Sequence, residues 1–166
     1  MLQIAEKLSG ILKDTDFYDN TYIVGGAVRD HLLGKESKDI DLVVELPDGG
    51  IKLAGFLYEN GYSSEPVVFK RFSTAFVWME GYKLEFVMTR KESYFPGSRK
   101  PNVEVATLEE DVFRRDFTVN SLLYSLKEKQ ILDLTRLARI DLSNKLIRAT
   151  SDPQILYQED PLRMLR

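Results

Sequence analysis

Apolar and polar residues alternate along the chain at two spacings, which predict a mixture of helices and short strands. In residues 2–13 the apolar positions recur at close to the helical period, so this segment is expected to form an amphipathic helix. A short apolar run at residues 22–24 predicts a strand, and the two glycines after it lead into a predicted helix at residues 27–33. Gly34 stands where this helix is expected to stop.

Beyond this region strands predominate, and a hairpin is predicted near the middle of the chain. Runs at residues 72–79 and 82–90 flank Glu80-Gly81, a dipeptide that favours a tight turn. Residues 91–106 show no clear period and predict a long exposed loop. The other predicted elements are a strand at 39–45, helices at 51–59 and 107–121, two β-like runs within 121–134, a short helix at 135–142, a short strand at 145–149, and helix starts at the Asp-Pro steps 152–153 and 160–161. Because hairpin-linked strands predominate, we expect an α+β fold without a regular parallel array.

Composition restricts the class of protein more than it identifies a function. The 166 residues fit one domain, and the apolar fraction of 43% and charged fraction of 30% are typical of a globular protein. No run of about 18 apolar residues occurs, so no membrane partner is expected. The absence of cysteine excludes disulfides and thiolate metal sites, and it favours a cytoplasmic location. The net charge of −3 argues against a dedicated nucleic-acid-binding domain, so any RNA is expected to be held mostly by residues outside this chain.

Two aspartates in the predicted strand at 39–45 are the first candidate for chemistry. Side chains alternate between the two faces of a strand, so Asp39 and Asp41 share one face, roughly 6–7 Å apart along the strand. Such a pair can hold a hard divalent cation such as Mg²⁺, which relieves the repulsion between the carboxylates. The alternative is a solvated polar face on an edge strand, and for an isolated Asp-x-Asp that alternative is favoured.

The glycine pair between the predicted strand and helix is the second candidate. Gly25 and Gly26 allow a phosphate group to approach the backbone N–H groups at a helix start, and Arg29 lies one turn further on. The alternative is a simple tight turn with Arg29 as a surface charge. A phosphate cradle and a carboxylate pair on successive strands form a stronger signal together than either does alone.

Five segments, in order along almost the whole chain, resemble the class II tRNA nucleotidyltransferases, that is, the CCA-adding and poly(A) polymerase family. They are residues 25–30, 32–34, 38–42, 108–120 and 159–166. The resemblance implies the head domain of the polymerase-β-like nucleotidyltransferase superfamily, with a mixed, mainly antiparallel sheet flanked by helices. It places this catalytic head at residues 1–150 and the truncated start of a neck domain at 151–166. The chain ends inside an apolar segment of helical pattern without a stop signal, so we expect a fragment.

The resemblance also implies a metal site. Asp39 and Asp41 are expected to hold two Mg²⁺ ions, with Glu85 as a third carboxylate on a neighbouring strand. One ion would lower the pKa of the primer 3′-hydroxyl and the other would neutralise the pyrophosphate that leaves. The alternative for Glu85 is a solvated side chain opposite an apolar strand face.

Two further segments are implied to bind the nucleotide. Arg115 is implied to contact the triphosphate or sugar, and Asn120 to order the same site; without the resemblance, Asp111 and Arg115 would be an ion pair on a helix surface. The last segment is implied to read the base, through the residues Asp160, Arg163 and Arg166. Its alternative is a capping aspartate before Pro161, followed by surface arginines.

The loop at 91–106 corresponds to a flexible loop that is linked in this family to the switch from C to A addition. It contains Tyr94, Phe95, Arg99 and Lys100, and its presence disfavours an enzyme that adds only CC.

The function implied is Mg²⁺-dependent, template-independent transfer of C and A from CTP and ATP to the 3′ end of tRNA. An A-adding enzyme or a poly(A) polymerase shares every segment and remains an alternative. A catalytically silent nucleotide- or RNA-binding module is the alternative from another class. The 166 residues alone are expected to bind nucleotide weakly and to transfer little or nothing.

Overall fold

A seven-stranded sheet forms the centre of the molecule, and its strands lie in the order β3-β4-β5-β2-β1-β8-β9. The computed structural model describes residues 1–70, 73–93 and 102–166. The strands of the sheet are β1 (Thr21–Val24), β2 (Asp39–Val44), β3 (Val67–Phe69), β4 (Thr74–Met79), β5 (Tyr82–Met88), β8 (Leu123–Ser125) and β9 (Gln130–Leu132). Only β2 and β5 pair in parallel, and the other neighbours are antiparallel. The prediction of a mixed, mainly antiparallel α+β fold is confirmed.

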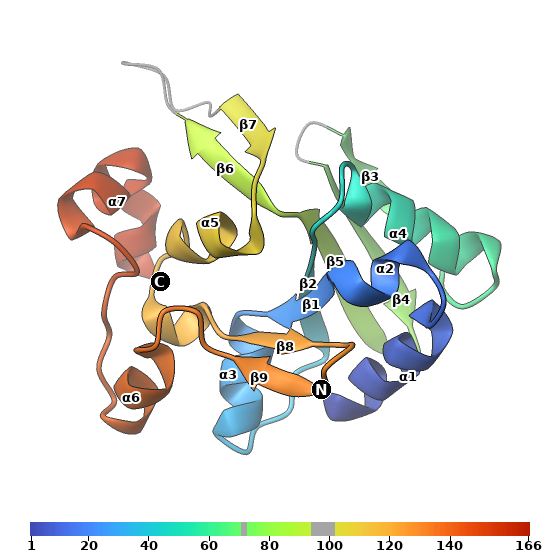
Figure 1. Cartoon of the computed structure of the whole chain (residues 1–166), viewed down its shortest axis with the longest axis horizontal. Helices are drawn as coiled ribbons and strands as arrows, with labels where there is room; N and C mark the ends of the chain where they lie inside the picture. Colours follow the sequence, from blue (N-terminus) through green and yellow to red (C-terminus); the bar gives the residue numbers. More distant parts are fainter. Residues whose placement is uncertain (71–72, 94–101) are drawn as a thin grey trace.

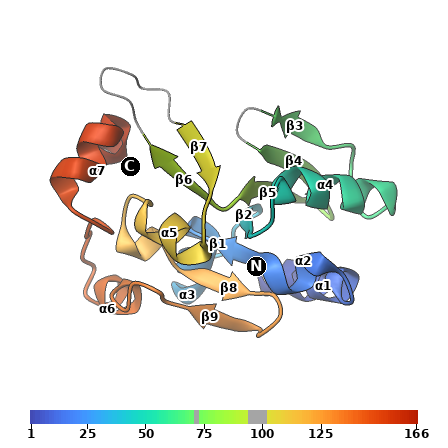
Figure 2. The same ribbon diagram turned by 45° about the horizontal axis from the view of Figure 1, so that its top comes forward.

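One face of this sheet is closed by helices. Buried side chains of β2, β4 and β5, such as Ile40, Val77 and Phe86, pack in one core with Leu8 and Leu53. These last two come from α1 (Leu2–Leu12) and α4 (Gly49–Glu59), and α3 (Gly26–Leu32) adds to the same core. In Figures 1 and 2, α1, α4 and the short α2 (Asp16–Asn20) gather on the side of β3, β4 and β5.

The opposite face is covered only in part. Val112 of α5 (Leu108–Phe113) packs against Val24, Val43 and Leu123, over β1, β2 and β8. The remaining C-terminal elements lie at the same end of the molecule (Figure 1), and they are η2 (Thr118–Asn120), α6 (Ala138–Ser143), α7 (Pro153–Glu159) and η3 (Pro161–Leu165). On the β3 and β4 side of this face, Phe69 and Trp78 are exposed in the described part of the chain.

The segment after β5 differs from the prediction of a long loop. Residues 90–93 and 102–105 form a second, antiparallel sheet of two strands, β6 (Arg90–Ser93) and β7 (Asn102–Val105). This pair projects from the end of β5, as Figure 2 shows. Tyr94, Phe95, Arg99 and Lys100, on which the flexible-loop interpretation depends, lie outside the described residues.

Other element predictions hold in outline but not in extent. The helix expected at 107–121 ends at Phe113, because Phe117 is extended and the Asp116 carboxylate accepts a hydrogen bond from the Phe117 N–H. The strand expected at 145–149 is reduced to an isolated bridge between Phe117 and Ala149. The short elements α2 and β3 were not predicted. Glu80 and Gly81 form the expected hairpin turn, both with positive φ.

No helix in the described part of the chain combines the length and the apolar character needed to cross a membrane. The cytoplasmic location stays a prediction.

Candidate active site

An open cavity of about 820 Å³ lies where the uncovered face of the sheet meets α3, α5 and the C-terminal η3. Its size falls within the usual range for small-molecule sites. The lining residues singled out by sequence are Gly25, Gly26, Arg29, Asp41, Glu85, Arg115, Asn120, Asp160, Arg163 and Arg166. One cavity therefore brings together ten of the eleven predicted site residues, from segments up to 141 positions apart. Asp39, the eleventh, is not among the lining residues.

The carboxylates lie on one face of two adjacent strands. Asp39 and Asp41 are exposed while Ile40 is buried, so the predicted alternation in β2 is confirmed. The parallel register sets Asp41 directly opposite Glu85 of β5, and Asp39 opposite Lys83. The Lys83 ammonium lies 3.6 Å from a Glu85 carboxylate oxygen. Glu85 thus lines the cavity, and Lys83 partly neutralises its charge.

The environment of Asp41 disfavours its charged form. Although Asp41 is exposed at the cavity, partial desolvation by the surrounding groups raises its pKa, and the negative charge of Glu85 raises it further. Arg115 and Lys83 lower it by less. Asp41 and Glu85 are therefore like charges set opposite each other in the strand register.

The acidic side chains at the cavity can be compared with those that usually bind Mg²⁺. Among the described residues, no group of three His, Cys, Asp or Glu side chains is assembled closely enough to hold a metal ion on its own. Mg²⁺ in nucleotide sites is commonly held by one or two carboxylates together with substrate phosphates. Asp41 and Glu85, with Asp39 two positions along the same face, fit that mode of binding. The metal stays a prediction.

The turn between β1 and α3 requires glycine at Gly25. Its φ of +70° and ψ of −134° lie where side chains with a Cβ are strained, and an added Cβ would lie 3.6 Å from an Arg115 nitrogen. The Gly25 N–H donates to the Leu122 carbonyl, so it is not free for a ligand. Any N–H groups offered to a phosphate come instead from the first turn of α3, where amides lack an acceptor within the helix.

A chain of polar contacts links α3 to the C-terminus across the cavity. Arg29 Nη1 donates to Asn120 Oδ1 at 2.6 Å, and Asn120 Nδ2 donates to Asp116 Oδ1 at 3.2 Å. The second Asp116 oxygen lies 3.4 Å from Arg166 Nη1. Asn120 thus joins Arg29 to Asp116, and its role in ordering a nucleotide site stays a prediction. Asp116 has no separate signal in the sequence apart from its place beside Arg115.

The alternative interpretation, an ion pair of Asp111 and Arg115 on a helix surface, is right about the pair and wrong about its location. Asp111 is fully buried and accepts hydrogen bonds from both Arg114, at 2.6 Å, and Arg115, at 2.8 Å. Burial alone would raise the pKa of Asp111, but the two guanidinium groups outweigh it and hold the pKa below its usual range. Because α5 packs on the sheet, Asp111 is enclosed, and it holds Arg115 at the cavity wall.

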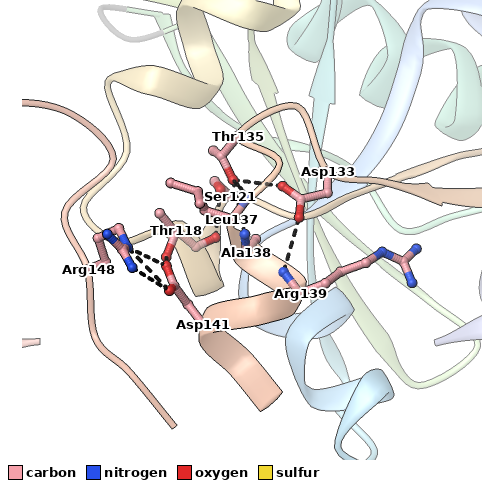
Figure 3. Close-up of polar contacts among 9 residues, drawn as sticks. All are labelled: Thr118, Ser121, Asp133, Thr135, Leu137, Ala138, Arg139, Asp141 and Arg148. Carbon is pink, nitrogen blue, oxygen red and sulfur yellow. Dashed lines mark hydrogen bonds and ion pairs between the residues drawn. The ribbon is translucent and has the colours of Figure 1, made fainter. Parts of the chain in front are cut away.

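A second buried carboxylate braces the turn that carries Asn120 (Figure 3). Asp141 of α6 accepts a hydrogen bond from Thr118 Oγ1 at 2.7 Å and two-pronged contacts from Arg148. The Thr118 N–H in turn donates to the Arg148 carbonyl at 2.9 Å. The hydrogen bonds from Arg148 hold the pKa of Asp141 below its usual range against the effect of burial. Sequence reasoning missed this group, because its members are joined only by tertiary packing.

Figure 3 also shows how α6 itself begins. Asp133 accepts hydrogen bonds from Thr135 Oγ1 and the Arg139 N–H, at 2.7 and 3.0 Å. Thr135 Oγ1 accepts from the Ala138 N–H at 3.1 Å. These contacts satisfy the first amides of α6 and fix Asp141 under η2.

The C-terminal segment combines both interpretations offered by the sequence. Asp160 caps η3 by accepting from the Leu162 N–H at 3.1 Å, so the capping alternative is confirmed. Arg163 is not a surface arginine, because it is 6% exposed and its Nη1 donates to the Leu156 carbonyl. Its Nε lies 3.8 Å from the other Asp160 oxygen. The side chains of Asp160 and Arg163 therefore meet at the cavity, and base reading stays a prediction.

Three lining residues of the open side were not singled out by sequence: Phe69, Thr74 and Arg90. Phe69 was missed because β3 has only three residues, too few to show a period.

A family model described as the poly A polymerase head domain matches residues 21–148. The A-adding tRNA nucleotidyltransferase of Aquifex aeolicus is 42% identical over 149 residues, which cover 87% of this chain and 17% of that protein. The CCA-adding enzyme of Bacillus pumilus is 35% identical over 148 residues, which cover 87% of this chain and 34% of that enzyme. This chain thus spans about a third or less of the length of these two relatives.

Solved structures give the same pattern. A tRNA nucleotidyltransferase complexed with a primer tRNA and an incoming ATP analog has a TM-score of 0.73 and 37% identity, covering 89% of this chain and 40% of that one. The structure of a CCA-adding enzyme in apo form II has a TM-score of 0.82 and 28% identity, covering 99% of this chain and 38% of that one.

Proposed function

We propose a function from one premise: the chain belongs to the poly(A) polymerase head-domain family. On that premise it is the catalytic head of a nucleotidyltransferase that adds C and A from CTP and ATP to the 3′ end of tRNA. The observation that carries this proposal is the arrangement of the cavity. The Asp41–Glu85 pair lies at its floor, and Arg29 and Arg115 lie with the α3 turn on the β1 side.

The triphosphate is assigned to the cationic side of the cavity. Arg29 and Arg115 supply planar forks of N–H donors, which match phosphate oxygens, and Gly26 at the start of α3 lines the same cavity. Asn120 and Asp111 hold these two arginines before the nucleotide arrives. A site that is ordered in advance loses less conformational freedom on binding.

The carboxylates are assigned to the reacting centre. Asp39, Asp41 and Glu85 would hold Mg²⁺, which when bound supplies charge neutralisation for the phosphates and a lower pKa for the primer 3′-hydroxyl. In the reaction the 3′-oxygen forms a bond to the α-phosphorus and the bond to pyrophosphate breaks. The residues of this chain contribute position and charge, and no covalent intermediate with the protein is needed.

The base is assigned to the C-terminal side. The Asp160 oxygen that does not cap η3 can accept from the exocyclic amine of cytosine or adenine, and Arg163 can donate to a ring nitrogen or carbonyl. Arg166 extends the same wall. In this proposal residues 151–166 belong to the start of the neck domain. Many of the contacts with tRNA are then made by residues outside the head domain.

An A-adding enzyme is the second candidate, and the 42% identity to the A-adding relative favours it. A transfer assay separates the candidates. The intact protein that carries residues 1–166 is offered tRNA ending before CCA, after C, or after CC, with each NTP and Mg²⁺. Incorporation of C onto the first two substrates and of A onto the third supports CCA addition. Incorporation of A alone onto the CC-ended tRNA supports the A-adding enzyme, and no incorporation at all supports a silent module.

A further inference from the structure

An aromatic surface borders the candidate active site on the side away from Arg29. It consists of Phe69, Phe76 and Trp78 with Lys83, and we refer to it as the aromatic face. Trp78 is 53% exposed and Phe69 is 48% exposed. Exposed apolar side chains that gather on one surface mark interaction sites more often than scattered ones do, and these two come from neighbouring strands of one sheet.

Strand register connects this surface directly to the carboxylates. Phe76 of β4 is paired with Glu85 of β5, which is paired with Asp41 of β2. Paired residues share a face, so the three side chains form a continuous row on the uncovered side of the sheet. In the adjacent row, Trp78 is paired with Lys83, which is paired with Asp39.

Phe69, Phe76 and Lys83 form the part of the aromatic face whose members contact one another. The rings of Phe69 and Phe76 lie with centroids 6.3 Å apart. The Lys83 ammonium lies 5.0 Å from the centroid of the Phe76 ring and 3.6 Å from Glu85. A positive charge thus lies between the aromatic rings and the proposed reacting centre.

The in-line geometry of phosphoryl transfer indicates which molecule lies over this surface. In phosphoryl transfer the attacking and leaving oxygens lie roughly in line through the phosphorus. The residues assigned to the triphosphate lie beyond β2 on the β1 side, so the leaving pyrophosphate occupies that side. The attacking 3′-hydroxyl must then approach from the β5 side, and the nucleotides next to it must pass over β5, β4 and β3.

The chemistry of the surface suits a single-stranded RNA end. Aromatic side chains stack on bases of any sequence, and a nearby cation attracts the backbone phosphates. We propose that the aromatic face binds the last unpaired nucleotides of the RNA primer by stacking, with Trp78 and Phe69 as the main contacts and Lys83 beside the terminal phosphate. The choice of RNA as the bound molecule rests on the proposed function. The binding experiment does not depend on that function.

Trp78 is the only tryptophan of the chain, so its fluorescence reports on this surface alone. A short single-stranded RNA ending in two cytidines is titrated into the 166-residue chain, and ATP alone serves as the second ligand. We expect the RNA to quench Trp78 fluorescence in a saturable way that weakens with salt, and ATP to leave it unchanged. No quenching by RNA, or equal quenching by ATP, overturns the proposal, as does a change that depends only on protein concentration and so reports self-association.

Kinetics of the intact protein give the second readout. Trp78→Ala is expected to raise KM for the RNA primer about ten-fold with little change in kcat or in KM for the NTP, and Trp78→Phe to restore most of the loss. Tyr58→Ala is the matched control, because Tyr58 is 47% exposed on α4, a helix that packs on the other face. An unchanged primer KM in Trp78→Ala overturns the aromatic face and leaves the nucleotidyltransferase proposal standing. Absence of transfer by the wild-type protein refutes the nucleotidyltransferase proposal. In that case the fluorescence titration still decides whether the aromatic face binds RNA.

Discussion

Arg29 of α3 donates a hydrogen bond to Asn120 of η2, with a distance of 2.6 Å between atoms of residues 91 positions apart. The contact joins the two segments that the family resemblance identified separately, the glycine turn and the segment after α5. Because Asn120 also donates to the buried Asp116, it holds Arg29 from a fixed base. In the proposed nucleotide site, the position of Arg29 therefore depends on a residue that has no charge of its own.

Removal of the Asn120 side chain should release Arg29 and weaken nucleotide binding. A hydrogen bond to a charged group contributes about 1.5–3 kcal/mol, so Asn120→Ala should raise the Kd for ATP by roughly ten- to a hundred-fold. Isothermal titration of the single variants Asn120→Ala and Arg29→Ala and of the double variant measures the coupling. Asn144→Ala, at an exposed asparagine of the C-cap of α6, is the control. Strictly additive losses in the double variant would show that Asn120 does not act through Arg29.

Asp111 should matter for stability as well as for the site. Asp111→Asn leaves Arg114 and Arg115 without the buried carboxylate that both contact, which should lower the free energy of unfolding by about 2–3 kcal/mol. Urea unfolding measures this loss. Glu109→Gln, on the exposed side of the same helix, should leave the unfolding midpoint where it is. Equal midpoints for the two variants would contradict the structural role given to Asp111.

Acid should weaken the fold partly through Asp141. Its pKa is lower in the folded protein than in the unfolded chain, chiefly because of the Arg148 hydrogen bonds. Its contribution to stability is therefore present above the unfolded pKa of about 3.9 and is lost as the pH falls through the lower folded value. Asp141→Asn should be less stable than the wild type at pH 7, and the difference should shrink towards pH 3.

The measurement is the urea midpoint as a function of pH for the wild type, Asp141→Asn and Asp14→Asn. Asp14 is exposed and serves as the control. If the difference between Asp141→Asn and the wild type is the same at pH 7 and pH 3, the low pKa of Asp141 does not contribute.

Gly25 should not tolerate a side chain. Its positive φ strains any residue with a Cβ, although the added atom would make only ordinary contacts with Arg115 and Asn120, so Gly25→Ala should cost about 1–3 kcal/mol of folding free energy and should weaken ATP binding. Gly10→Ala is the contrasting change, because Gly10 lies in α1 with open space around its Cα. This control should raise stability by about 0.5–1 kcal/mol. Thermal unfolding compares the two, and equal effects would contradict the conformational argument.

Local patterns in the sequence were sufficient for the features that need only neighbouring residues. The alternation in residues 39–44 placed Asp39 and Asp41 on one face, and Glu80-Gly81 predicted the hairpin. The three residues of β3 and the five of α2 were too few to show a period. The extent of the helix at 107–121 was overestimated because the Asp116 side chain, and not a glycine or proline, ends the helical run.

Pairings between distant segments were the part that local patterns could not supply. Glu85 was proposed mostly from the resemblance, since nothing in its own strand predicts that the parallel register sets it opposite Asp41. The burial of Asp111 and the contact of Asp141 with Arg148 follow from how α5 and α6 pack against the sheet and η2. An i,i+4 ion pair looks the same in sequence whether it lies in water or under a helix, and only packing separates the two cases.

The central claim is that Asp41 serves the reaction and not the fold, and the Asp41→Asn variant tests it most directly. The folded-state pKa of Asp41 is raised, so its charge opposes folding at neutral pH, and removal of that charge should leave the protein at least as stable as the wild type. Transfer of labelled nucleotide to tRNA should fall about a thousand-fold, the loss expected when several kcal/mol of metal-assisted charge stabilisation is removed. The measurement is single-turnover incorporation by the intact protein, with Asp14→Asn as control and urea unfolding alongside. A stable Asp41→Asn protein with almost no transfer is the predicted result, and a stable protein that transfers at the wild-type rate would contradict the account.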